Sequence, residues 1–112
     1  MIVDDDPDEV LLISRYLEGK EVDIDHADKV EDVITKLRST HYDMIFIDYL
    51  MPKIDGLELI EQLKEEGVRC PMYAVSFLFR KDVELLAERK NIKLDGIISK
   101  ANLKEDLINL FT

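Results

Sequence analysis

The chain has 112 residues, of which 46% are hydrophobic and 36% are charged, a length and composition that fit one domain with a core and a solvated surface. Its formal net charge of -10 disfavours nucleic-acid binding by this domain, because contacts to phosphates need clustered Lys and Arg. No apolar run approaches the roughly 20 residues of a membrane span, and no signal-peptide pattern is present, so we expect no membrane contact. Cys70 is a lone cysteine, so no disulfide within the chain is possible. Together these features favour one cytoplasmic domain over residues 1–112.

Short apolar runs alternate with helical periods along the chain. The first run, Met1-Ile2-Val3, precedes Asp6-Pro7-Asp8-Glu9, a pattern typical of a helix start with an Asp cap, Pro in the first turn and Glu three residues after the cap. The alternation of Val22-Asp23-Ile24-Asp25 predicts a half-exposed second strand. A second helix is indicated by apolar residues at helical spacing, Val30, Val33, Ile34 and Leu37.

The rest of the chain continues this alternation. Met44 to Ile47 is a continuous apolar run, as expected for a strand covered on both faces. Then follow a helix over Gly56 to Glu66 and a strand over Pro71 to Val75. Val83, Leu86 and Ala87 mark a fourth helix after the entry Arg80-Lys81-Asp82, and a strand at Ile97-Ile98 and a helix from Leu103 complete the chain. Five strands that alternate with five helices predict an α/β fold with a doubly wound, five-stranded parallel sheet.

Polar residues follow four of the predicted strands. Asp4-Asp5-Asp6, Asp48, Ser76 and Lys100 would all lie at the carboxyl edge of the sheet, where ligands bind in such folds. Two carboxylates 4 Å apart repel by about 4 kcal/mol at an effective dielectric constant near 20, so converging acids favour binding of a cation. Oxygen ligands suit Mg²⁺ or Mn²⁺, and a carboxylate can serve as the nucleophile in phosphoryl transfer. Lys100 would supply a positive charge and Ser76 a hydroxyl donor.

This combination resembles the receiver domain of two-component response regulators over essentially the whole chain. The resemblance rests on Val3-Asp4-Asp5-Asp6-Pro7, Tyr42-Asp43 ahead of Asp48, Met51-Pro52, Asp55-Gly56, Pro71 ahead of Ser76, and Lys100. It implies a flavodoxin-like fold with strand order 2-1-3-4-5. Only three residues precede Asp4, fewer than is usual in the family, so we expect a short first strand, through trimming of the N-terminus or an unusual start.

The resemblance also implies roles for individual residues. Asp48 corresponds to the phosphoacceptor, Asp5 to a direct Mg²⁺ ligand and Asp4 to a ligand that acts largely through water. Asp48 itself and the main-chain carbonyl of Leu50 complete the implied metal ligands. The implied cofactor is Mg²⁺, or Mn²⁺ in its place.

Two further residues and the partners follow from the same resemblance. Lys100 would pair with the phosphoryl group, and the hydroxyl of Ser76 would move toward it. The donor would be the phosphohistidine of a histidine kinase or phosphotransfer protein. Phosphorylation would change the surface formed by the fourth helix, fifth strand and fifth helix, which is also a candidate surface for pairing two copies. Such a switch catalyses its own phosphorylation and slow autodephosphorylation but is not a turnover enzyme.

The chain departs from the family at several positions. Ile97 stands where the family has a switch aromatic, Phe77 follows Ser76 where a small residue is usual, and Ala101 replaces the proline after the lysine. These changes leave open an alternative to the leading interpretation of a switch, namely a receiver-like interaction module that no longer switches by phosphorylation. A Mg²⁺-dependent phosphohydrolase is a weaker alternative, because Leu50 stands where that class has a general acid. Leu50 and Leu78 cannot orient an attacking water, so we expect a long-lived aspartyl phosphate.

Overall fold

The computed structural model describes residues 1–20, 24–51 and 54–111. Within these ranges strands and helices alternate in the predicted order. The elements are β1 (Ile2–Val3), α1 (Pro7–Tyr16), β2 (His26–Ala27), α2 (Val30–Ser39), β3 (Ile45–Asp48), α3 (Gly56–Glu65), β4 (Met72–Ser76), α4 (Arg80–Arg89), β5 (Gly96–Ser99), the short 3-10 helix η1 (Lys100–Asn102) and α5 (Leu103–Leu110).

The strands form one parallel sheet in the order β2-β1-β3-β4-β5. β1 lies between β2 and β3, so Val3 pairs with Ala27 on one side and with Ile47 on the other. The winding of the chain reverses between these neighbours, and their carboxyl ends mark the edge where ligands bind in doubly wound sheets. The predicted five-stranded, flavodoxin-like sheet is therefore confirmed.

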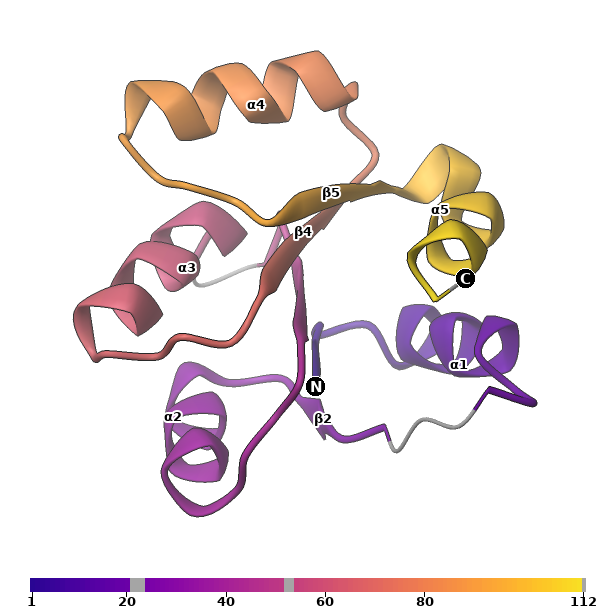
Figure 1. Ribbon diagram of the computed structural model, residues 1–112, viewed down its shortest axis with the longest axis horizontal. Coiled ribbons are helices and arrows are strands. Elements are labelled where there is room, and N and C mark those ends of the chain that lie inside the picture. Colours follow the sequence, from indigo (N-terminus) through magenta and orange to yellow (C-terminus); the bar gives the residue numbers. More distant parts are fainter. Residues whose placement is uncertain (21–23, 52–53, 112) are drawn as a thin grey trace.

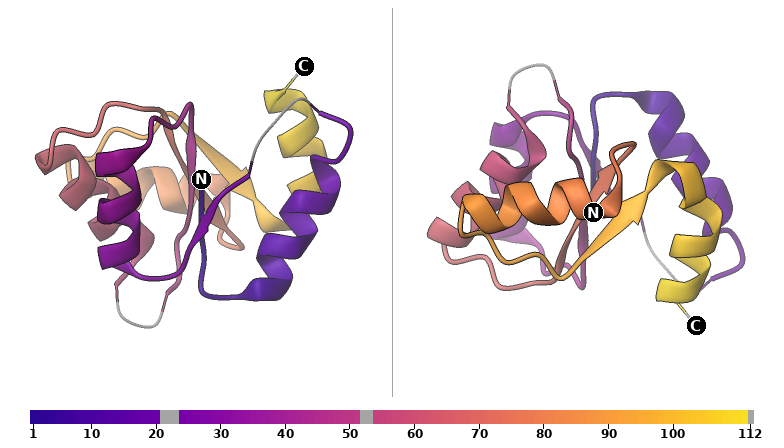
Figure 2. Two further views of the ribbon diagram at one scale, coloured as in Figure 1. Left: turned by 90° about the horizontal axis from the view of Figure 1, so that it is seen from below. Right: turned by 90° about the horizontal axis from the view of Figure 1, so that it is seen from above.

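Helices cover both faces of the sheet (Figures 1 and 2). α1 and α5 lie side by side on one face, and α2, α3 and α4 cover the other. Side chains of β3 alternate between the two cores: Ile45 and Ile47 pack beneath α2 and α3, and Phe46 packs toward α1 and α5. Among the described helices, none has the length and apolar character needed to cross a membrane.

The second strand lies further along the chain than the sequence pattern predicts. β2 consists of His26 and Ala27, whereas the alternation indicated residues 22–25, of which 22 and 23 lie outside the described ranges. Pairing with β1 begins where the amide of Ile2 donates to the carbonyl of Asp25. Ile24 is 39% exposed and contributes little to the core. The pattern thus predicted that a strand exists but not its register, which hydrogen bonds to β1 determine.

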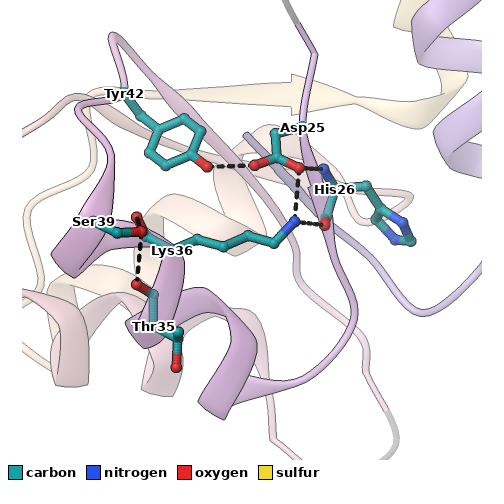
Figure 3. A network of polar contacts seen from close by, with 6 residues as sticks. All are labelled: Asp25, His26, Thr35, Lys36, Ser39 and Tyr42. Atoms are coloured by element: carbon teal, nitrogen blue, oxygen red, sulfur yellow. Dashed lines mark hydrogen bonds and ion pairs between the residues drawn. The ribbon is translucent and has the colours of Figure 1, made fainter.

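A network of polar contacts joins β2 to α2 and to the segment before β3 (Figure 3). Lys36 Nζ donates to Asp25 Oδ1 at 2.7 Å and to the His26 carbonyl at 2.9 Å, and the Tyr42 hydroxyl donates to Asp25 Oδ2. The hydrogen bond from Lys36, followed by that from Tyr42, lowers the pKa of Asp25 to about 2. This carboxylate therefore anchors the edge strand of the sheet to its covering helix.

We expect Lys36→Met to lower the free energy of unfolding by about 1 kcal/mol at pH 7. The side chains of Lys36 and Asp25 are 35% and 42% exposed, so solvent screens the pair and the loss is smaller than the pKa shift alone implies. A carboxyl with a lowered pKa stabilises the fold above its unfolded pKa and loses that contribution as the pH falls through about 2. Urea unfolding of both proteins should show a difference that shrinks toward acidic pH; a constant difference would contradict the assignment.

Candidate functional site

Three carboxylates meet at the carboxyl edge of the sheet, where β1 and β3 end as neighbours. Oxygen atoms of Asp4, Asp5 and Asp48 all lie within 4.8 Å of one another. Asp4 and Asp48 are buried and Asp5 is exposed, so the cluster opens to solvent on one side. The structure thus brings together the three acids that the sequence placed at separate strand ends.

The start of α1 holds Asp4 in place. Asp4 Oδ1 accepts a hydrogen bond from the Asp6 amide at 2.9 Å, and Asp6 caps α1 by accepting from the Asp8 amide at 3.0 Å. On the other side, His26 Nε2 lies 2.8 Å from the carbonyl oxygen of Asp4. Both neighbouring segments therefore fix the backbone of Asp4, and its carboxylate is oriented by the protein itself.

Burial is the main reason why the pKa of Asp4 is raised to about 7. The hydrogen bond from the Asp6 amide opposes this shift, and the charge of Asp48 adds to it. The nearby Lys100 lowers the pKa of Asp4 but does not offset its burial, so the metal-free protein holds a carboxyl group that takes up a proton near neutral pH.

We expect Asp4→Asn to raise the free energy of unfolding of the metal-free protein at pH 7 by roughly 2 to 4 kcal/mol, because one pKa unit corresponds to about 1.4 kcal/mol. A carboxyl group whose pKa is raised in the folded state contributes its full stability only below its unfolded pKa of 3.8. That stability is lost as the pH rises to the folded pKa of about 7. The advantage of the variant should therefore be small near pH 4 and grow toward neutrality. Urea unfolding in EDTA across this pH range measures the difference in the free energy of unfolding. A variant less stable than the wild type at pH 7 would refute the prediction.

Gly56, the first residue of α3, lies against the end of β3. The Gly56 amide donates to the Tyr49 carbonyl at 2.8 Å, and Asp55 caps α3 by accepting from the Glu58 amide at 2.8 Å. A Cβ on Gly56 would lie 2.4 Å from the carbonyl oxygen of Asp48 and 2.9 Å from Tyr49 Cα. Only glycine fits at this position, and its close approach braces the backbone that carries the Asp48 carboxylate.

Lys100 reaches the acids from the end of β5. Its Nζ lies 3.0 Å from Asp48 Oδ1 and 3.6 Å from Oε1 of Glu9 on α1, and 5.1 Å from the centre of the Phe77 ring. Burial, the largest single influence, lowers the pKa of Lys100, but the nearby carboxylates, Asp48 first, together outweigh it and the pKa is raised. Lys100 is therefore a charged partner of Asp48.

Ser76 lies at the end of β4, the strand next to β3. It is buried, and its Oγ accepts a hydrogen bond from the Leu78 amide at 2.9 Å. Within the described ranges no hydrogen bond joins Ser76 to Asp48 or Lys100. The hydroxyl proton is left for another acceptor, since a hydroxyl group accepts and donates at once.

The carboxylates fit a hard divalent cation. Mg²⁺ is usually bound by one or two carboxylates together with water. Asp48 Oδ1 is buried and, apart from its ion-pair contact with Lys100, has no hydrogen-bond partner in the described part of the chain. The exposed Asp5 leaves room for water on the open side. The role of the Leu50 carbonyl as a further ligand stays a prediction.

Comparison with known proteins assigns this arrangement to a family. The family model for the response regulator receiver domain matches the chain over residues 1–112. The chain belongs to the response regulator receiver domains. Such domains act as signalling switches of two-component systems and not as classical enzymes.

Two curated relatives share about a third of their aligned residues with this receiver domain. The sensor protein EvgS of Escherichia coli O157:H7 is 33% identical over 76 residues, which are 68% of this chain and 6% of EvgS. The alkaline phosphatase synthesis transcriptional regulatory protein PhoP of Bacillus subtilis is 31% identical over 84 residues, which are 75% of this chain and 34% of PhoP. The receiver domain thus spans a minor part of the length of either relative.

A solved structure supports the fold independently. The receiver domain of the Francisella response regulator 1452 matches with a TM-score of 0.80 at 23% identity, covering 97% of this chain and 89% of that one. At this level of identity the likeness confirms the fold alone.

The departures from the family have distinct structural settings. Ile97 is 5% exposed and packs with Ala74 and Val83, so an aliphatic side chain fills the position of the switch aromatic. Phe77 is 69% exposed, and its ring lies beside Lys100. Ala101 lies within η1, and the described peptide bonds are all trans.

Sequence reasoning missed one residue of this site, Glu9. Its place three residues after the Asp6 cap is typical of a capping box, in which the Glu side chain bonds back to the amide of the cap residue. In the structure that amide donates to Asp4 instead, and Glu9 extends to Lys100. Asp4 could have indicated that Glu9 does not form a capping box, because an acid two residues before the cap competes for the amide of the cap residue.

Proposed function

We propose that this receiver domain is a signalling switch that accepts a phosphoryl group on Asp48. The observation that carries the proposal is the setting of that carboxylate, which is buried beside two other acids and lies 3.0 Å from Lys100 Nζ. The donor that we propose is the phosphohistidine of a histidine kinase or phosphotransfer protein. The cytoplasmic location stays a prediction.

The proposed transfer exchanges one bond to phosphorus for another. A carboxylate oxygen of Asp48 attacks the phosphorus atom, the phosphorus–nitrogen bond of the donor breaks, and the leaving imidazole takes up a proton. Lys100 pairs with negative charge on the phosphoryl oxygens, and the Ser76 hydroxyl donates to one of them. When bound by Asp4, Asp5 and Asp48, Mg²⁺ would supply charge neutralisation for the incoming group. The product is an aspartyl phosphate.

The proposed output follows from where the phosphoryl-binding side chains lie in the chain. Ser76 directly precedes the turn into α4, and Lys100 begins η1, which leads into α5. An aspartyl phosphate adds negative charge and acceptor oxygens that draw both side chains inward. The α4–β5–α5 surface would then shift between two conformations, which a partner can distinguish.

Ile97 favours a second candidate, an interaction module that no longer switches by phosphorylation. Because Ile97 is buried against Ala74 and Val83, no aromatic ring is available there to follow the Ser76 hydroxyl. In that case the α4–β5–α5 surface would bind its partner regardless of the state of Asp48.

Incubation with acetyl phosphate and MgCl₂, followed by intact-mass measurement, tests the proposal. We expect one phosphoryl group per chain, lost at alkaline pH and absent in EDTA or in Asp48→Asn. Asp43→Asn is the matched control, since the side chain of Asp43 is 95% exposed and it should be phosphorylated normally. No phosphoryl gain by the wild type would end the proposal. Phosphorylation without amide shifts in α4, β5 and α5 would favour the second candidate.

We expect the aspartyl phosphate to be long-lived. Leu50 and Leu78 are 65% and 37% exposed beside the site, and neither side chain can hold a water molecule for attack on phosphorus. Leu50→Asn should therefore shorten the half-life severalfold. Phosphate release followed over time measures this. A wild-type half-life of seconds, or an unchanged half-life in the variant, would count against it.

A further inference from the structure

Lys100 lies between two carboxylates, and only one of them belongs to the acid cluster. The second is Glu9, in the first turn of α1, whose Oε1 lies 3.6 Å from Lys100 Nζ. The Glu9 side chain is 16% exposed, and its Oε2 is buried without a hydrogen-bond partner in the described ranges. A buried acceptor without a partner destabilises a fold, so another interaction must hold Glu9 in this position.

Helix capping is not that interaction. Asp6 caps α1, and the Asp6 amide that a capping box would use is bonded to Asp4. Acids in the first turn stabilise the positive end of a helix, but the exposed Asp8 already provides such a charge. What distinguishes Glu9 from Asp8 is its contact with Lys100. α1 packs against α5, which brings Glu9 close to the end of β5.

We propose that Glu9 is a positioning residue that competes with the phosphoryl group for Lys100; the inference rests on the proposed function. In the unmodified domain Lys100 is shared between Asp48 and Glu9. An arriving phosphoryl group draws Lys100 to its own oxygens, because it carries close to two negative charges. Glu9 is then left largely buried, with a weaker cation contact, beside a new anion. Its carboxylate therefore opposes phosphorylation and favours the unmodified state.

Binding of BeF₃⁻, a non-covalent mimic of a phosphoryl group on a carboxylate, tests this directly. Glu9→Gln keeps the shape of the side chain and removes its charge. In MgCl₂ we expect the variant to bind BeF₃⁻ about fivefold to tenfold more tightly than the wild type, because one buried like charge is removed. The initial rate of phosphorylation by acetyl phosphate should rise in parallel. Asp8→Asn removes a charge from the same turn at an exposed position and should stay within about twofold of the wild type.

A second readout does not depend on phosphorylation. Competitive acylation with acetic anhydride, followed by peptide mass spectrometry, compares Lys100 with the exposed Lys104. Lys100 should become severalfold more reactive in Glu9→Gln and remain unchanged in Asp8→Asn. Urea unfolding confirms that each variant is folded.

The outcomes separate the two proposals. A wild type that takes up neither BeF₃⁻ nor a phosphoryl group overturns the proposed function, and with it any competition for Lys100. A wild type that takes up both, with a Glu9→Gln variant that shows unchanged or weaker BeF₃⁻ binding, overturns the role of Glu9 alone. An equal gain in Asp8→Asn also overturns it, because the effect would then be one of net charge.

Discussion

Lys100→Met is expected to lower the free energy of unfolding of the metal-free domain by about 3 kcal/mol, in the range for removing one partner of a buried ion pair. The side chains of Lys100, Asp48 and Glu9 are 9%, 5% and 16% exposed. Without the ammonium group the buried Asp48 and the largely buried Glu9 would both lose the cation that they contact. Met is similar in length to Lys, so lost packing contributes little to this effect.

Urea unfolding in EDTA and in MgCl₂ measures the expected loss for Lys100→Met. The loss should be smaller in MgCl₂, because a bound cation replaces part of the missing positive charge. Lys90→Met is the matched control: Lys90 is 38% exposed and lies 3.7 Å from both Asp55 and Glu58. Exposed pairs of this kind contribute about 1 kcal/mol or less. Equal losses for the two variants would show that Lys100 acts as an ordinary surface lysine.

Gly56→Ala is expected to destabilise the domain by about 3 kcal/mol, at the upper end for overpacking. The added Cβ would lie 2.4 Å from the carbonyl oxygen of Asp48 and 2.9 Å from Tyr49 Cα. Both are backbone atoms, so no rotamer change can relieve the clash. The start of α3 must move away from β3, which would also displace the Asp48 carboxylate.

Gly67→Ala separates this clash from the general cost of replacing a glycine. Gly67 has a φ of +88° and nothing within 4 Å of its added Cβ, so only backbone strain of about 1 kcal/mol is expected. Unfolding and acetyl phosphate labelling should both be impaired in Gly56→Ala, whereas labelling should be normal in Gly67→Ala. Indistinguishable variants would contradict the proposed bracing of Asp48.

Much of the fold could be predicted because local signals agree with the topology. Asp6 caps its helix as the sequence indicates, and the continuous apolar run before Asp48 forms the central strand. Parallel strands that alternate with helices end at one edge of the sheet. This placed Asp4 and Asp48 near each other although they are far apart in sequence.

The features that escaped prediction depend on competition between groups from different elements. The register of β2 is determined by its hydrogen bonds to β1, and not by its own alternation. Glu9 does not form the expected capping contact, because the Asp6 amide donates to Asp4 and the Glu9 carboxylate contacts Lys100. Likewise, the bond from the Leu78 amide to Ser76 Oγ follows from a turn geometry that the residue types alone do not specify.

The central claim is that the acids at the ends of β1 and β3 act as one cation site, and a calorimetric Mg²⁺ titration tests it most directly. We expect one Mg²⁺ per wild-type chain and an affinity at least about tenfold weaker in Asp5→Ala and in Asp48→Asn, since each removes a predicted ligand. Asp43→Asn, which changes an exposed acid, should bind as the wild type does. A wild type without Mg²⁺ affinity, or equal affinities in all four proteins, would contradict the account.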